Sequence, residues 1–218
     1  MMAAMRPIRA LLLDYSGVFT TPPFTGFPAL EESKGLAPGA LLELLWGDYG
    51  DRAGTHAWHQ LERGELTFAE YWEDMQTRAK ASFGDEFEVA EMAAAMRDNF
   101  AIHHVMVTRV RQLKPSYRTA LCTNNVKEFG DGWRSTIPVD DLFDVVIDSS
   151  HVGKRKPEPA YFAHVLDTVG VDADEAVFLD DMLCNVEGAR DAGLTAIHVT
   201  DVSVAIAELD ELLAARAR

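Results

Sequence analysis

The chain has 218 residues, of which 48% are hydrophobic, and a formal net charge of −15. This length and apolar content are enough for one large domain, or for one domain with a smaller insert, around a buried core. Nucleic acids and anionic membrane surfaces repel an acidic protein, so the charge argues against both as the main partner.

The first predicted element is a short strand that ends at a carboxylate. The run from Ile8 to Leu13 is apolar apart from Arg9, and Asp14-Tyr15-Ser16-Gly17 follows directly. A carboxylate at a strand end is placed to act as a nucleophile or a metal ligand. Asp and Gly also end strands because they favour turns, so this segment alone does not define a site.

Helices without strands are predicted for the next part of the chain. Residues 21–35 contain closely spaced Pro and Gly and predict an ordered loop or a hinge instead of a helix. Thr67 with Glu70 matches a capping box at a helix start. Apolar stripes at helical spacing follow over residues 41–46, 68–79 and 89–100, the last one including Phe100.

From about residue 102 the pattern alternates between helices and strands. Strands are predicted near residues 118–122, 143–147, 176–179 and 194–198, followed by a helix over about 202–215. This alternation is typical of a parallel sheet. We therefore predict an α/β fold whose Rossmann-like parallel-sheet core comprises residues 1–20 and 102–218, with residues 21–101 as an inserted helical domain.

Three later segments also combine polar groups with a predicted strand or helix start. One strand ends in Thr123, Asn124 and Asn125, and another ends in Asp180 and Asp181, with Asn185 four residues further on. A cationic loop, Gly153-Lys154-Arg155-Lys156-Pro157-Glu158-Pro159, precedes a helix whose first turn suits Pro159. Because the carboxyl ends of parallel strands meet at one sheet edge, we expect these segments to gather near Asp14.

In this order the four segments resemble the motifs of the haloacid dehalogenase superfamily, whose members are mostly phosphate-transferring hydrolases. The resemblance covers the whole chain and implies that the helical insert is a cap domain over the active site. It implies that Asp14 is the nucleophile and that Thr123 and Asn124 bind the substrate phosphate. It also implies that Lys156 steadies the nucleophile and the phosphate.

The same resemblance implies a magnesium site. Asp14 and Asp181 would be the carboxylate ligands, and the backbone carbonyl of Ser16 would be a third ligand. Asp180 and Asn185 are assigned supporting roles by matching the family's spacing. Mg²⁺ favours oxygen ligands and keeps several waters, so this set is a sufficient protein contribution.

Ser16 is the main departure from the family pattern. Related phosphatases usually place a second aspartate there, which protonates the leaving alcohol and later activates water. General acid–base catalysis contributes ~10²–10⁴-fold, so its loss is expected to restrict the enzyme to good leaving groups such as acyl phosphates. His56, His59 and Glu62 in the insert are candidates to replace the missing acid.

We therefore predict a magnesium-dependent hydrolase or phosphotransferase that acts on a small anionic, phosphorylated metabolite through an aspartyl-phosphate on Asp14. Two alternatives stay open: a catalytically lapsed phosphate-binding or interaction module, and a non-phosphate reaction such as dehalogenation or phosphonate cleavage. Dehalogenases of the family generally lack the paired acids, so Asp180-Asp181 argues against that reaction. Phosphonate hydrolases need a cap lysine, and Lys34 and Lys80 do not lie in apolar settings.

The remaining composition bears on compartment and assembly. Cys122 and Cys184 lack the spacing of a metal site, the N-terminal apolar run stops at Asp14, and no segment approaches the ~20 apolar residues that span a bilayer. We therefore expect a cytoplasmic protein, either a monomer or a homodimer, with no nucleic-acid or membrane partner.

Overall fold

The core of the molecule is a five-stranded parallel sheet. The computed structural model describes residues 6–97 and 100–217. The strands are β1 (Ala10–Leu13), β2 (Arg118–Thr123), β3 (Val145–Asp148), β4 (Ala176–Asp180) and β5 (Thr195–His198), in the spatial order β3-β2-β1-β4-β5. Because β1 is the central strand and both faces of the sheet are covered, all four of its residues are buried. The predicted α/β parallel sheet is confirmed.

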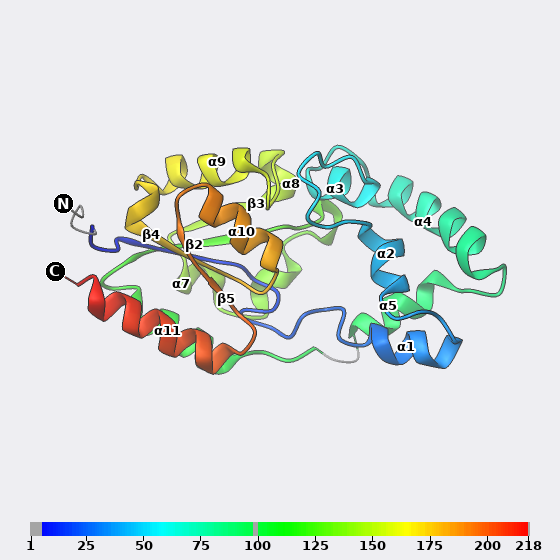
Figure 1. The fold of residues 1–218 in the computed structure, drawn as a ribbon, viewed down its shortest axis with the longest axis horizontal. Coiled ribbons are helices and arrows are strands. Elements are labelled where there is room, and N and C mark those ends of the chain that lie inside the picture. The colour runs from blue at the N-terminus through cyan, green and yellow to red at the C-terminus, as the bar shows by residue number, and fades with distance from the viewer. Residues whose placement is uncertain (1–5, 98–99, 218) are drawn as a thin grey trace.

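Helices cover both faces of this sheet (Figure 1). One face packs against α6 (His104–Leu113), α7 (Val139–Leu142) and α11 (Val202–Ala215), and the other against α9 (Pro159–Val169) and α10 (Leu183–Asp191). Alternating side chains of β1 supply both layers, with Leu11 and Leu13 in the first and Leu12 in the second. Short helical turns complete the core: η1 (Lys127–Phe129), η2 (Gly132–Ser135), α8 (Ser149–Val152) and η3 (Ala173–Glu175).

The chain leaves the core after β1 and forms a separate group of helices at one end of the molecule (Figure 1). These are α1 (Phe27–Lys34), α2 (Ala40–Trp46), α3 (Ala57–Glu62), α4 (Phe68–Phe83) and α5 (Val89–Arg97), which share a hydrophobic cluster of their own. The outgoing and returning segments pair, since the Thr21 N–H donates to the Ala101 carbonyl at 2.9 Å and the His103 N–H donates to the Phe19 carbonyl at 2.8 Å.

Most element boundaries agree with the sequence predictions. The four later strands and the C-terminal helix lie within about two residues of their predicted positions. The capping box is formed, with both the Thr67 side chain and the Glu70 side chain bonded to the reciprocal backbone N–H groups. The division into a core of residues 1–20 and 102–218 and a cap of 21–101 stays a prediction, and its residues 1–5, 98–99 and 218 lie outside the described part.

Two local predictions are wrong. Residues 27–34, expected within a loop, form α1 because Pro28 lies in its first turn, where a missing N–H costs nothing, and Gly35 ends it at φ 65°. The turn formers therefore mark the ends of a helix. Phe100 does not extend the apolar stripe of α5, since the side chain is 52% exposed and lies beyond the last helical residue.

Candidate active site

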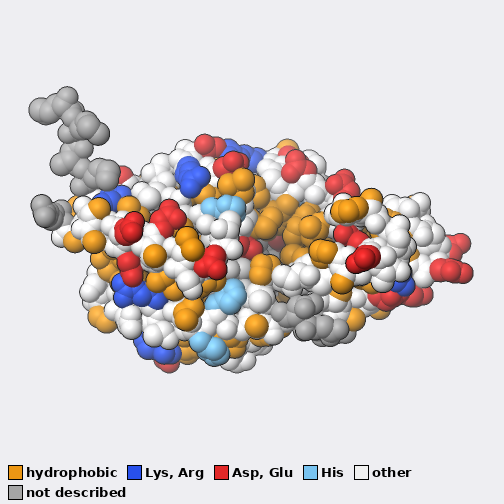
Figure 2. Space-filling view, turned by 60° about the horizontal axis from the view of Figure 1, so that its bottom comes forward, with side chains coloured by type: hydrophobic (Ala, Val, Ile, Leu, Met, Phe, Trp, Pro, Cys, Tyr) orange, Lys and Arg blue, Asp and Glu red, His pale blue; other side chains and the backbone are white. Residues whose placement is uncertain are grey.

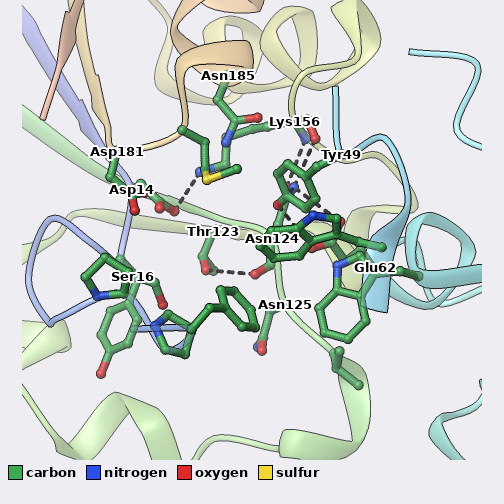
Figure 3. A pocket seen from close by; sticks show the side chains of 18 of the residues that line it. Asp14, Ser16, Tyr49, Glu62, Thr123, Asn124, Asn125, Lys156, Asp181 and Asn185 are labelled. Carbon is green, nitrogen blue, oxygen red and sulfur yellow. Dashed lines mark hydrogen bonds and ion pairs between the residues drawn. The ribbon is translucent and has the colours of Figure 1, made fainter. Parts of the chain in front are cut away.

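The predicted site residues meet at the carboxyl edge of the sheet (Figure 3). Asp14 follows β1, Thr123 ends β2, and Asp180 ends β4. Lys156 reaches the same place from the loop before α9, Asp181 directly follows β4, and Asn185 lies in the first turn of α10. The parallel topology therefore brings together groups that are up to about 170 positions apart in the chain.

A buried lysine connects two of the carboxylates. The Lys156 ammonium lies 2.6 Å from Asp14 Oδ1 and 2.7 Å from Asp180 Oδ2, and all three side chains are at least nine-tenths buried. Burial lowers the pKa of Lys156, but Asp14 and Asp180 raise it by more, so the amine stays protonated. Lys156 is therefore a fixed positive charge in direct contact with the predicted nucleophile.

Asp180 and Asp181 have different surroundings. The Asp180 carboxylate accepts hydrogen bonds from the Met182 N–H at 2.8 Å and from Asn185 Nδ2 at 3.0 Å, besides its ion pair with Lys156. Asp181 is only partly buried and lines the cavity. Asp180 thus holds Lys156 in place, whereas Asp181 presents its carboxylate to whatever enters.

The three acids fit a divalent cation. Carboxylate oxygens of Asp14, Asp180 and Asp181 all lie within 4.8 Å of one another, a spacing that one hard cation with oxygen ligands spans. Burial raises the pKa of Asp14 to about 7 against the lowering effect of Lys156, and burial, with Asp14 and Asp180 beside it, raises that of Asp181 to about 8. One lysine therefore does not offset this many buried negative charges, and a bound Mg²⁺ would.

Gly17 makes this close approach feasible. Its φ is 78°, and a Cβ atom at this position would lie 2.1 Å from the Asp181 carboxylate. No other residue type fits such a contact in the left-handed region of the backbone. Gly17 is therefore needed to bring the segment after Asp14 against the Asp181 carboxylate.

Ser16, Thr123 and Asn124 also line the cavity. The Asn124 side chain donates to the Lys156 carbonyl and accepts from the Lys156 N–H, both at 2.9 Å. It therefore fixes the loop that carries the lysine, a positioning contact that the sequence did not indicate. The Thr123 hydroxyl donates to the Asn124 carbonyl at a long 3.3 Å, which leaves it available to a ligand oxygen.

Sequence reasoning missed a buried ion pair between the helical insert and the core. Glu62 Oε2 of α3 lies 2.6 Å from Arg155 Nε, and Arg155 is fully buried although the sequence favoured no role for it. Tyr49, also unpredicted, donates from its hydroxyl to Glu62 and accepts from Asn124 Nδ2. No sequence signal identifies this pair, because its partners are 93 positions apart.

The three candidate acids of the insert have different places. Glu62 lines the cavity, whereas His56 and His59 are not among its described lining residues. His59 is fully buried, neither of its ring nitrogens has a hydrogen-bond partner, and burial lowers its pKa to about 3. It is therefore a neutral packing residue, which leaves Glu62 as the member of this set that faces the cavity.

α/β enzymes carry their reacting groups at the carboxyl edge of a parallel sheet, and the cavity of this chain lies at that edge. Residues 8–193 match the haloacid dehalogenase-like hydrolase family, and the chain belongs to that family of enzymes. Bifunctional epoxide hydrolase 2 of Rattus norvegicus is 28% identical over 217 residues, which cover 94% of this chain and 39% of the relative. The chain therefore spans about two fifths of that relative's length.

A second relative matches over nearly its whole length. The sesquiterpene phosphatase of Aspergillus oryzae is 26% identical, and the alignment covers 94% of this chain and 96% of the relative. The family thus includes relatives named as phosphatases.

Solved structures confirm the fold. A family enzyme from Bacteroides thetaiotaomicron, in complex with magnesium and inorganic phosphate, has a TM-score of 0.61 at 21% identity and covers 88% of this chain and 93% of its own. An L-2-haloacid dehalogenase from Xanthobacter autotrophicus has a TM-score of 0.58 at 18% identity and covers 88% and 77%. At these identities the likeness shows the fold alone.

Within residues 6–97 and 100–217, no helix combines the length and the apolar character needed to cross a bilayer. Cys122 and Cys184 are both free thiols.

Proposed function

We propose that the protein is a magnesium-dependent phosphohydrolase of a small phosphorylated metabolite, with Asp14 as the nucleophile. The observation that carries this proposal is the contact of one buried lysine with Asp14 and Asp180, beside the half-buried Asp181. The magnesium and phosphate bound to the Bacteroides enzyme and the name of the Aspergillus relative support it.

The side chains suit a two-step displacement. The Asp14 oxygen that is not held by Lys156 attacks phosphorus, and the ester P–O bond breaks with its electron pair on the leaving oxygen. Water then attacks the aspartyl-phosphate, which releases phosphate and restores the carboxylate. Lys156 and the Thr123 hydroxyl stabilise the phosphoryl oxygens throughout.

The metal has a restricted role in this scheme. Asp14, Asp181 and the Ser16 carbonyl would hold Mg²⁺, which would neutralise charge on the phosphoryl group and on the two carboxylates. Asp180 and Asn185 support this arrangement by fixing Lys156 and the segment after β4.

The alternative reactions have less support. Lys156 is the one lysine among the described residues of the cavity wall, and Lys34 forms an ion pair with Glu91 instead, so no cap lysine is placed for phosphonate cleavage. A dehalogenase needs no metal site, and three clustered carboxylates would then repel one another without benefit. A cytoplasmic location and a monomeric or homodimeric state remain predictions.

The test is phosphate release from acyl, aryl and alkyl phosphates, with Mg²⁺ or with EDTA, by the wild type and by Asp14→Asn. We expect activity to require the metal and to fall by roughly 10³-fold or more in the variant, since the nucleophile is lost. Asp141→Asn, an exposed position on α7, serves as the control for a changed charge. Release that persists in Asp14→Asn, or that ignores EDTA, would refute the proposal.

A further inference from the structure

We propose that the preferred substrate is the phosphate monoester of a small apolar phenol. This inference rests on the proposed phosphohydrolase function and adds the chemical class of the leaving group. Two separate features of the cavity carry it: the aromatic walls, and the absence of an uncommitted acid among the described residues that line it.

The walls away from the sheet edge are mainly aromatic. They combine side chains of the insert with side chains of two core loops: Phe24, Trp46, Tyr49, Trp58, Met96, Phe129, Trp133 and Met182. The Trp46 ring lies 4.5 Å from the Phe24 ring and 4.7 Å from the Tyr49 ring, so these rings form a packed aromatic surface. Figure 2 shows hydrophobic side chains gathered at the middle of one face, between the core and the helical end.

Such walls suit an aromatic ring and not a sugar or a polyol. Aromatic groups make favourable edge-to-face contacts with rings of this kind, in addition to the gain from burying their apolar surface. The charged group that the insert contributes to the described wall is Glu62, and Arg155 already neutralises it. A hydroxyl-rich alcohol would leave water for a wall that has few hydrogen-bond partners, at a net cost.

The size of the cavity limits the substrate. Its volume is about 270 Å³, slightly below the ~300–1,000 Å³ range of small-molecule sites. The phosphate takes the part beside Asp14 and Lys156. The remaining space fits one substituted ring better than a long chain.

The second feature is the state of the ionisable groups in the wall. Glu62 accepts hydrogen bonds from Arg155 Nε at 2.6 Å and from the Tyr49 hydroxyl at 3.2 Å, so its carboxylate is surrounded by donors and Tyr49 has committed its proton. In Figure 3, Glu62 lies on the opposite side of the cavity from Asp14, Ser16 and Asp181.

The other ionisable groups are committed as well. The Tyr15 hydroxyl is engaged with the Thr136 hydroxyl and the Trp133 carbonyl, and Lys156 with its two carboxylates. Asp14 is the proposed nucleophile and Asp181 a proposed metal ligand, so both carboxylates already have a role. Among the described wall residues, none is thus free to protonate the leaving oxygen.

A phenol needs no such acid. Its pKa is ~10, whereas an alkyl alcohol is about as weak an acid as water, at ~15.7. When Asp14 attacks, the P–O bond breaks, its electron pair stays on the phenolate oxygen, and bulk water protonates that oxygen after release. An aromatic leaving group therefore satisfies both the wall and the missing acid.

The experiment compares four phosphate esters: phenyl phosphate, phosphotyrosine, benzyl phosphate and glycerol 1-phosphate. Phenyl phosphate and phosphotyrosine share a phenolic leaving group and differ in polarity, whereas phenyl and benzyl phosphate are both apolar and differ in leaving-group pKa. We expect kcat/KM for phenyl phosphate to exceed that for benzyl phosphate by ~10²-fold or more, the value of the missing acid. It should exceed that for phosphotyrosine by ~10-fold or more.

Two variants separate the features. Ser16→Asp should raise benzyl phosphate hydrolysis more than phenyl phosphate hydrolysis and so narrow their ratio by about tenfold or more, because it supplies an acid. Phe129→Ser should raise KM for phenyl phosphate by roughly tenfold and leave that for phosphotyrosine nearly unchanged. Phe100→Ser is the matched control, since both phenylalanines are 52% exposed and Phe100 is not a described wall residue.

The outcomes distinguish this inference from the proposed function. If Asp14-dependent, magnesium-dependent release occurs equally with all four esters, or favours glycerol 1-phosphate, the inference is wrong and the phosphohydrolase proposal stands. If none of the esters gives Asp14-dependent release and acetyl phosphate gives none either, both proposals fall.

Discussion

The two sides of the active-site cavity are built from different kinds of contact. At the sheet edge, charged side chains are held by direct bonds, as in the contacts of Lys156 with Asp14 and Asp180. The opposite wall consists of packed rings such as Trp46 against Phe24 and Tyr49. Directional bonds fix reacting atoms, whereas apolar contacts select by shape and polarity. We therefore expect the core to supply the reacting groups, and the insert with its adjoining loops to select the substrate.

The first prediction concerns the sheet edge. Lys156→Met should lower kcat/KM by about 10²–10³-fold, because it removes a charge placed at the phosphoryl group. It should also lower the free energy of unfolding by ~3–5 kcal/mol, because two buried carboxylates lose their partner. Steady-state kinetics and urea denaturation measure the two effects.

Lys154→Met is the control for this change, since Lys154 lies in the same loop, is less buried and does not line the cavity. Similar losses in both variants would show that the loop as a whole, and not the contact with Asp14, is responsible.

The second prediction concerns the junction between the two sides. Glu62→Leu should lower the free energy of unfolding by ~3–5 kcal/mol, because it leaves the fully buried Arg155 guanidinium without its carboxylate. The double variant Glu62→Leu/Arg155→Met should recover most of that loss, since no charge is then left unpaired. Urea denaturation of the single and double variants supplies the free energies of a double-mutant cycle, which measures the interaction between Glu62 and Arg155.

A second ion pair between the insert and the core is the matched control. Arg52 and Asp191 lie 2.6 Å apart with side chains 41% and 62% exposed, and exposed pairs contribute ~0–1 kcal/mol. Arg52→Met should therefore change stability by less than ~1 kcal/mol. Equal effects at the buried and the exposed pair would show that burial does not set the strength of this junction.

The third prediction is that His59 in the insert makes the free energy of unfolding depend on pH. Burial lowers the pKa of His59 to about 3 from its usual 6.5, so the unfolded chain binds a proton that the folded chain does not. Its contribution to stability is complete above pH 6.5 and is lost as the pH falls toward 3. Between pH 7 and pH 5 this amounts to about 2 kcal/mol.

His59→Leu should remove this component. Urea denaturation at pH 7 and pH 5 would then show a smaller acid-induced loss of stability in the variant than in the wild type. An identical loss in the two proteins would mean that His59 is protonated in the folded protein.

The smallest expected effect is at the start of α4. Thr67→Ala should cost ~1 kcal/mol of stability, because the Glu70 N–H loses its side-chain acceptor. Thr67→Ser keeps the hydroxyl and should retain most of the stability. Thermal unfolding of both variants measures the difference, and equal midpoints for Ala and Ser would contradict a role for the cap.

The sequence predicted the sheet edge much better than the opposite wall. Asp14, Thr123, Asp180 and Asp181 each follow an apolar run within a few residues, and that pattern is local in the chain. The wrong expectation for residues 27–34 arose because Pro and Gly favour helix ends as well as loops, and the sequence alone does not separate the two. Phe100 was assigned to the apolar stripe because it keeps the helical spacing of residues 89–96, although it lies outside α5.

The sequence by itself thus determined the succession of strands and helices along the chain and the polar residues that follow the strands. The reason is that hydrophobic periodicity and strand termination are properties of neighbouring residues. Only the tertiary structure decided that Arg155 pairs with Glu62, that Asn124 holds the Lys156 loop, and which aromatic rings line the cavity. These contacts join residues far apart in the chain, from 32 positions for Asn124 and Lys156 to 93 for Glu62 and Arg155. Packing between distant segments leaves no local pattern, which is the physical reason that the polar residues at the sheet edge were predictable and the aromatic wall was not.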